Sequence, residues 1–134
     1  MPEDNPSIMN HVSIGVADPE KAWAFYDAVL ATIGAVRVVD EPTAVAYGKV
    51  FPEFWVHVPF DSGSAEKANG SHFSFNAASI DQVQAFYEAA IANGATDDGP
   101  PGPRPEYGDP YYGCFVRDPD GHKIEATYWD VNLA

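Results

Sequence analysis

The hydrophobic pattern near the N-terminus predicts a strand followed by a helix. In "HVSIGV" (11–16), apolar residues alternate with small or polar ones, as in a strand with one buried face. In the next segment, apolar residues recur at helical spacing: Ala22, Phe25, Tyr26, Val29, Leu30 and Ile33. Asp18 is suited to the N-cap and Pro19 to the first turn, and Gly34 can end the helix in a left-handed conformation.

The same pattern returns in the second half of the chain. "HFSFNAASIDQVQAFYEAAI" begins at His72, an offset of 61 from His11, and reaches Phe-Tyr at the same place as the first copy. Ser79 and Gln82 form a candidate capping box, and Gly94 stands where the second helix should end. Helical stripes alone do not reproduce a histidine, a cap and a glycine stop together, so the chain contains a duplicated unit.

Further strand-like runs follow each predicted helix: 35–39, 43–47 and 53–58 in the first half, and 111–117 and 123–129 in the second. A short strand near 95–98 completes the second half, and the segment 97–110 is predicted to be a long loop because it is rich in Pro and Gly. The fold class is therefore α+β, with two βαβββ modules. We expect one domain over residues 1–134, with module one at about 8–60, a linker at about 61–70 and module two at about 71–130.

Composition limits the partners of the chain. It carries 20 Asp and Glu against 7 Lys and Arg, a formal charge of −13, which disfavours binding to nucleic acid. No apolar run approaches the roughly 18 residues of a membrane span, and the N-terminus does not resemble a signal peptide. Cys114 is the single cysteine, so a reducing compartment is the simpler reading and a cytoplasmic location is expected. The hydrophobic fraction of 46% is sufficient for a packed core.

Each helix should cover one face of its own sheet, and alternation then assigns the residues of the opposite face. That face takes His11 and Ser13, Trp55 and His57, His72 and Ser74, and Glu125, Thr127 and Trp129. If the faces of the two modules curve toward one another, three histidines and one carboxylate converge. Two imidazoles and a carboxylate suit Fe(II), Mn, Co, Ni or Zn, with coordination positions left open for water or substrate.

The motifs "HVSIGVADPEKAWAFYDAVL", "HFSF…AFYEAA" and "FVRDPDGHKIEA" together resemble the vicinal oxygen chelate superfamily, the glyoxalase, bleomycin-resistance and extradiol-dioxygenase group. The resemblance extends from about His11 to Trp129. It implies paired modules in a curved, barrel-like mixed sheet, with helices outside and a divalent metal inside. It also implies metal ligands at His11, His72 and Glu125, and bidentate chelation of a small substrate through neighbouring oxygens.

The chain departs from the patterns of individual branches of this superfamily. Trp55 stands where glyoxalase I enzymes carry a carboxylate ligand in the first module, so the four-ligand arrangement is broken unless His57 substitutes. Phe115 stands where ring-cleaving dioxygenases carry a tyrosine. The basic and polar cluster of the fosfomycin-modifying members is not found. The reaction therefore stays open among lyase, isomerase and oxygenase chemistry.

Two functions remain as alternatives. One is a metal-dependent enzyme acting on a small oxygenated compound, in which His57, Tyr107 or Tyr111 supplies a proton. The other is a metal-free protein that binds a drug or metabolite in an aromatic cleft containing Trp55 and Trp129.

In either case, Arg104 in the Pro-rich loop is expected to meet an oxygen of the ligand as the loop closes over the cleft. The sequence leaves open whether the modules pair within one chain or across a homodimer.

Overall fold

The computed structural model describes residues 5–66 and 68–134, so the first four residues of the predicted domain and Lys67 of the predicted linker lie outside the described residues. Module one consists of β1 (Val12–Gly15), α1 (Pro19–Ala31), β2 (Val36–Glu41), β3 (Ala44–Gly48) and β4 (Phe54–His57). Module two consists of β5 (His72–Asn76), α2 (Ile80–Ala92), β6 (Thr96–Pro103), β7 (Tyr111–Arg117) and β8 (Lys123–Trp129). Short 3-10 helices cover Pro105–Tyr107 and Val131–Leu133. No helix in the described part of the chain has the length and apolar character needed to cross a membrane.

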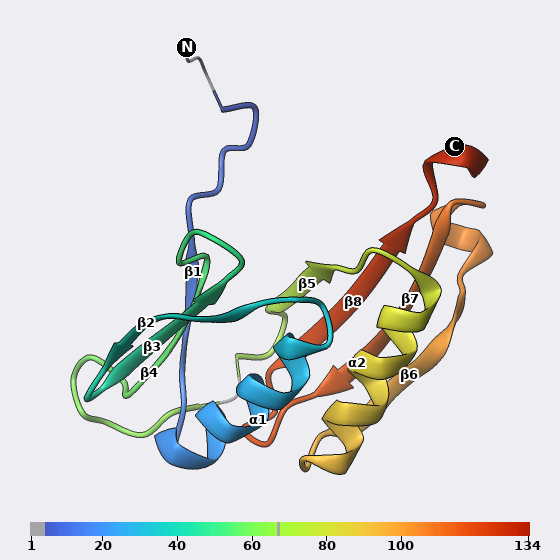
Figure 1. Cartoon of the computed structure of the whole chain (residues 1–134). Coiled ribbons are helices and arrows are strands. Elements are labelled where there is room, and N and C mark those ends of the chain that lie inside the picture. The colour runs from blue at the N-terminus through green and yellow to red at the C-terminus, as the bar shows by residue number, and fades with distance from the viewer. Residues whose placement is uncertain (1–4, 67) are drawn as a thin grey trace.

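The two modules have the same topology, which confirms the predicted duplication and the α+β class. The strand order is β1-β4-β3-β2 in one sheet and β5-β8-β7-β6 in the other. In each sheet the first and last strands of the module are parallel and the other pairs are antiparallel. The described strands therefore form two separate four-stranded mixed sheets rather than one closed barrel (Figure 1).

The helix ends form where the sequence predicts them. Asp18 caps α1 by accepting from the backbone N–H of Lys21, and Ser79 caps α2 by accepting from that of Gln82. Gly34 and Gly94 follow the two helices with φ of 83° and 103°, a conformation that suits a residue without Cβ. The repeated N-cap and C-terminal glycine thus place each helix in the same position relative to its own sheet.

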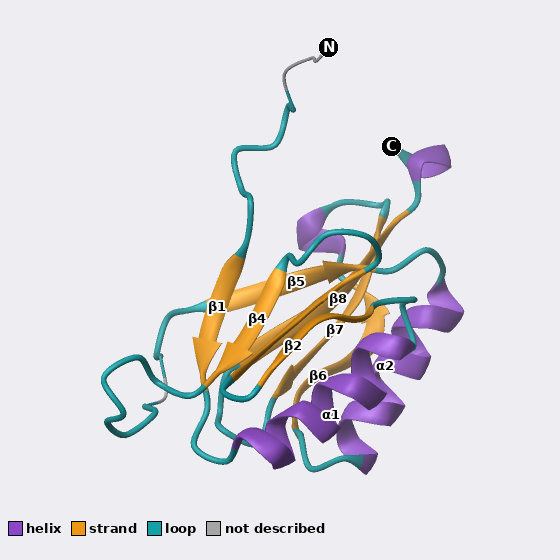
Figure 2. Ribbon diagram, turned by 60° about the vertical axis from the view of Figure 1, so that its left-hand side comes forward, coloured by secondary structure: helices purple, strands orange, loops and turns teal. Residues whose placement is uncertain are grey.

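The two modules share one hydrophobic core. The helices α1 and α2 lie side by side and cover the same side of the molecule (Figures 1 and 2). The Phe54 ring of β4 packs against Phe73 and Phe75 of β5, with centroid distances of 5.9 and 5.0 Å. The helix-facing sides of both sheets therefore merge into a continuous interior. The opposite side of each sheet, called the open face below, carries the candidate site residues.

A polar contact also joins the modules, at the turn between β7 and β8. The buried Asp118 carboxylate accepts from Tyr26 Oη of α1 at 2.5 Å, and Asp120 accepts from the backbone N–H of Ala17 at 2.9 Å. His122 Nε2 donates to the Gly15 carbonyl at 2.9 Å. We call Asp118, Asp120 and His122 the inter-module clasp. Burial raises the pKa of Asp118 above its ordinary value, against the lowering effect of its hydrogen bond from the Tyr26 hydroxyl.

The prediction of a loop over 97–110 is wrong for its first part, because β6 continues to Pro103. β6 is the edge strand of its sheet, where a proline without an N–H need not disrupt a second ladder. Its pairing with β7 shifts register between Asp97 and Gly99 and again between Gly99 and Gly102. The strand therefore accommodates Gly and Pro as an irregular edge, which strand periodicity does not reveal.

Candidate functional site

The open face of module two contains a buried carboxylate with three hydrogen-bond donors. Glu125, in the middle of β8, is 6% exposed. Its Oε1 accepts from His72 Nε2 at 2.6 Å, and its Oε2 accepts from the Tyr111 hydroxyl at 2.5 Å and from Thr127 Oγ1 at 2.8 Å. The strands that position these groups are β5, β7 and β8, whose register places Ser74 next to Glu125 and Gly113 next to Thr127.

These hydrogen bonds keep Glu125 ionised. Burial alone would raise the pKa of Glu125, but the donors Tyr111, His72 and Thr127 together outweigh it and hold this pKa below its ordinary value. Burial and the neighbouring carboxylate in turn raise the pKa of Tyr111, so its phenol stays protonated and keeps donating. The result is a fixed negative charge on the open face of module two.

An aromatic ring and two cations lie on the same face, where Phe115 of β7 pairs with Glu125 of β8. The Phe115 ring lies 5.9 Å from the His72 ring, and the Arg104 guanidinium and Lys123 ammonium lie 5.8 and 5.0 Å from the Phe115 centroid. Arg104 also donates to the carbonyls of Pro100 and Pro103, at 2.7 and 3.2 Å. Arg104 is therefore anchored at the edge of β6 and faces the same side as Glu125.

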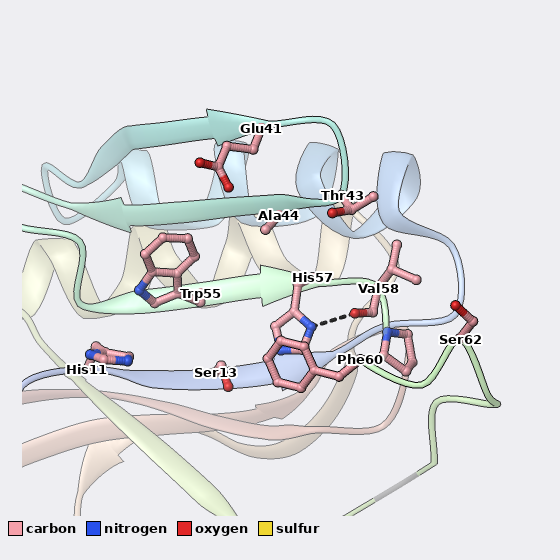
Figure 3. Close-up of a pocket in the computed structure, with 11 residues that line it drawn as sticks. His11, Ser13, Glu41, Thr43, Ala44, Trp55, His57, Val58, Phe60 and Ser62 are labelled. Atoms are coloured by element: carbon pink, nitrogen blue, oxygen red, sulfur yellow. Dashed lines mark hydrogen bonds between the residues drawn. The ribbon is translucent and has the colours of Figure 1, made fainter.

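The open face of module one contains a cavity of about 530 Å³ (Figure 3). His11 and Trp55 lie edge to face along it, with ring centroids 6.3 Å apart. The His57 ring stacks on the exposed Phe60 ring at 4.4 Å. His57 Nδ1 lies 2.6 Å from the Val58 carbonyl, which can only accept, so Nδ1 carries the proton and Nε2 of the neutral ring is an acceptor.

The structure brings together some of the predicted site residues and separates others. His72, Glu125 and Tyr111 are in direct contact, with Tyr107 packed on Tyr111 at a centroid distance of 5.0 Å. His11 lies on module one; it lines, together with His72, a crevice of about 330 Å³. Within residues 5–66 and 68–134, however, no three His, Cys, Asp or Glu side chains gather closely enough to hold one ion.

Two further predicted residues stand apart from these contacts. Trp129, at the end of β8, is 50% exposed, and Trp55 is half-buried in the module-one cavity. Neither indole contacts Glu125 through a hydrogen bond or ring contact found in the described residues. Of the two tryptophans predicted to form an aromatic cleft, Trp55 lines the module-one cavity together with Phe60, and Trp129 is not among the residues that line it.

Sequence reasoning missed two residues that the geometry makes important. Phe60 follows β4 in a polar connector, and no periodicity marks it. Gly113 lies inside β7, where a glycine commonly indicates the close approach of another group. A Cβ at this position would lie 2.2 Å from the Tyr111 hydroxyl. That glycine was the available signal for the contact between Tyr111 and Glu125.

Comparisons with known proteins agree on the architecture. A family model described as the Glyoxalase/Bleomycin resistance protein/Dioxygenase superfamily matches residues 8–126. A glyoxalase/bleomycin resistance protein from Albidiferax ferrireducens T118 is 38% identical with a TM-score of 0.84, over 90% of this chain and 98% of that one. No curated protein matches the chain.

Two more distant structures share the fold. A glyoxalase-related enzyme from Fulvimarina pelagi is 18% identical with a TM-score of 0.71, over 92% of this chain and 88% of that one. A lactoylglutathione lyase from Agrobacterium tumefaciens is 22% identical with a TM-score of 0.62, over 93% of this chain and 95% of that one. At these identities, the likeness concerns the fold alone.

Proposed function

The chain belongs to the glyoxalase/bleomycin resistance protein/dioxygenase superfamily, and we propose that it is a metalloenzyme acting on a small oxygenated molecule. The observation that carries this proposal is the contact between His72 and Glu125, an imidazole and an ionised carboxylate at 2.6 Å on the open face of module two. Their donor atoms are those that Fe, Mn, Co, Ni or Zn takes from proteins. The reaction class is lyase, isomerase or oxygenase chemistry, and a cytoplasmic location stays a prediction.

The donor atoms of His72 and Glu125 support the proposal of a divalent ion. His72 is 44% exposed in its side chain and can move outward, whereas Glu125 is buried and fixed by its other partners. An ion between them would replace the proton that His72 now donates. When bound, it would polarise the neighbouring oxygens of a substrate and stabilise negative charge on them. We propose His11 as the third protein ligand.

A second copy of the chain would supply that third ligand. The two modules of one chain join through their helix-facing sides, so the open faces lie outside the common core. We propose a homodimer in which the open face of module one in one copy covers that of module two in the other. His11 of one chain would then meet His72 and Glu125 of the next, and the two-fold symmetry would create two equal sites.

The other residues of the two open faces have roles in binding the substrate and moving protons. The cavity beside Trp55 would hold the substrate, with Phe60 as its outer wall. His57 lines this cavity, and its Nε2 can accept a proton from the substrate because its Nδ1 donates to the Val58 carbonyl. Arg104 would bind an anionic or carbonyl oxygen of the substrate from the edge of β6. A proton-donating role for Tyr107 or Tyr111, and a substrate contact for Trp129, remain predictions.

Mixing two inactive variants tests both the ligand set and the assembly. His11→Ala and Glu125→Ala each remove one proposed ligand, from opposite modules. If the site spans two chains, subunit exchange between these variants restores about a quarter of the wild-type metal sites, because half of the dimers are mixed and each contains one intact site. Metal content by mass spectrometry and molar mass by light scattering measure this. No recovery from a mixture that has exchanged subunits would contradict the shared site, and wild type without metal after reconstitution would contradict the metalloenzyme.

The alternative function is metal-free binding of a drug or metabolite, which the module-one cavity favours. It has an aromatic wall in Trp55 and Phe60, and Trp55 stands where a carboxylate would serve a metal. Binding to this cavity should quench Trp55 fluorescence equally in metal-free and metal-loaded protein. Quenching by ligand that disappears in Trp55→Phe and does not respond to chelators would favour this function over the enzyme.

A further inference from the structure

The two oxygens of Glu125 have different surroundings. Oε1 meets His72, whose side chain is 44% exposed, on the accessible side of the face. Oε2 accepts from two donors, Tyr111 and Thr127. Ser74 Oγ lies 2.7 Å from Thr127 Oγ1; since Thr127 uses its only proton on Glu125, Ser74 donates to Thr127. One oxygen is thus committed to neutral donors within the chain, and the other remains available on the outer side.

The contact of Tyr111 depends on Gly113. The phenol of Tyr111 lies across β7 at this glycine, where a Cβ would stand 2.2 Å from the hydroxyl oxygen and 2.6 Å from Cζ. Such a Cβ would also lie 2.8 Å from the Ala126 carbonyl, so the backbone cannot yield easily. Any larger residue at this position would displace the hydroxyl from Glu125. Tyr111 is 6% exposed, which protects the hydrogen bond from competition by water.

We propose that Tyr111, held over Gly113, is a positioning residue that fixes Glu125 so that Oε1 is the oxygen offered to the metal ion. The inference rests on the proposed metal site and assigns Tyr111 a role different from proton donation to substrate. The physical reason is that a buried carboxylate held through one oxygen has little rotational freedom left to lose when the other oxygen binds an ion. Thr127, supported by Ser74, assists from the same side.

The neighbouring tyrosine provides a matched control. Tyr112 is the next residue in β7 and points to the opposite face, where its hydroxyl accepts from Gln84 Nε2 of α2 at 3.2 Å. Tyr112→Phe removes the same atom from the same strand without approaching Glu125. Tyr111→Phe keeps the ring on Gly113 and against Tyr107 while removing the hydroxyl through which Tyr111 donates to Glu125.

Titration of the full-length protein with Co²⁺, followed by its visible absorption bands, tests the proposal. Tyr111→Phe should weaken Co²⁺ binding by about 10- to 100-fold, the usual effect of losing a partner of a metal ligand. Its band positions or intensities should also change, because Glu125 can then turn and offer either oxygen. Thr127→Val should weaken binding in the same direction, and Tyr112→Phe should match wild type in both affinity and spectrum. Thermal unfolding of the metal-free variants checks that each is folded.

The outcomes separate this inference from the proposed function. If wild type and Glu125→Ala bind Co²⁺ equally, the metal site itself is wrong and the positioning role falls with it. If Glu125→Ala abolishes binding while Tyr111→Phe and Thr127→Val keep the affinity and spectrum of wild type, the metal site stands and the positioning role is overturned. A loss in Tyr112→Phe as large as in Tyr111→Phe would also overturn it, since the effect would then come from general damage to β7.

Discussion

The open faces of the two modules have the same framework and different chemistry. In module one, Ser13 of β1 pairs with Trp55 of β4; in module two, Ser74 of β5 pairs with Glu125 of β8. Trp55 and Glu125 therefore occupy equivalent positions. Each stands next to a histidine at the start of its module: His11, just before β1, or His72, the first residue of β5.

The strands next to these two positions, β3 in module one and β7 in module two, also differ. Ala44 of β3 faces His57, while Gly113 of β7 faces Thr127 at the equivalent place. Among the described residues, module two has a tyrosine over this small residue, and its hydroxyl donates to Glu125. Module one instead forms an aromatic cavity. One copy of the duplicated unit thus has an ionised carboxylate beside its histidine, and the other has an indole beside its histidine and a cavity with an aromatic wall.

This difference has a consequence for assembly. Within the described part of the chain, neither module gathers three metal-ligating side chains, and His11 does not form one cluster with His72 and Glu125. A site built from two unlike faces needs both, and in this chain the faces lie outside a common core.

Weakening the inter-module clasp should destabilise both modules by the same amount, because they unfold in one transition. Asp118→Ala leaves the buried Tyr26 hydroxyl and the backbone N–H groups of Asp120 and His122 without their acceptor. At about 1–3 kcal/mol for each unsatisfied buried group, partly relieved by water, the free energy of unfolding should fall by about 3 kcal/mol. Urea unfolding measures it, with the exposed Asp109→Ala as control. A loss below about 1 kcal/mol, or separate transitions for the two modules, would contradict the shared core.

Removing the carboxylate of module two should affect metal binding more than removing the histidine of module one. Glu125→Ala should weaken Zn²⁺ binding by at least about 100-fold, because four ligands together contribute about 10–16 kcal/mol in small zinc sites. His11→Ala should cost less, since the pair His72–Glu125 stays intact within each chain. Competition with a chromogenic chelator gives both constants, and Glu41→Ala in the module-one cavity is the control. Equal losses in the first two variants would show that the modules contribute alike.

Giving module one the carboxylate of module two should reduce the difference between them. Trp55→Glu places an acidic side chain beside His11 in the register that Glu125 has beside His72. We expect Zn²⁺ to bind about 10-fold more tightly, equivalent to about 1.4 kcal/mol. Trp55→Gln removes the same indole without adding charge and should not tighten binding. Identical constants for the two variants would mean that position 55 does not reach the metal.

The smallest expected effect concerns Arg104, at the edge strand β6 of module two. Arg104 donates to two carbonyls of the irregular strand β6. Because this hydrogen bonding is near the surface, Arg104→Ala should change the free energy of unfolding by about 0.5 kcal/mol. Arg104→Lys keeps the charge but not the planar fork, so it should show a similar loss. Chemical denaturation is the measurement; a loss above about 2 kcal/mol would mean that Arg104 holds β6 in place.

Much of the fold follows from local patterns that the sequence alone displays. Periods of two and 3.6 identify β1 and α1, and the pair Asp18 and Gly34 marks where the first helix begins and ends. These signals depend on a few adjacent residues, and the repeat at an offset of 61 doubles each of them. The same periodicity assigned His72 and Glu125 to one face of the second module, because side chains in a strand alternate strictly.

Only the tertiary structure decided which residues of that face touch. Tyr111 and Glu125 are on antiparallel strands, and their contact depends on the register of β7 against β8 and on the missing side chain of Gly113. The Gly- and Pro-rich segment of β6 can form a strand because it lies at a sheet edge. Its place in the strand order cannot be inferred from any local sequence pattern. The direction in which the open faces point likewise depends on how Phe54 packs against β5, a long-range contact made by the helix-facing sides. Alternation determines the face of each residue, whereas register and packing between distant segments determine its neighbours.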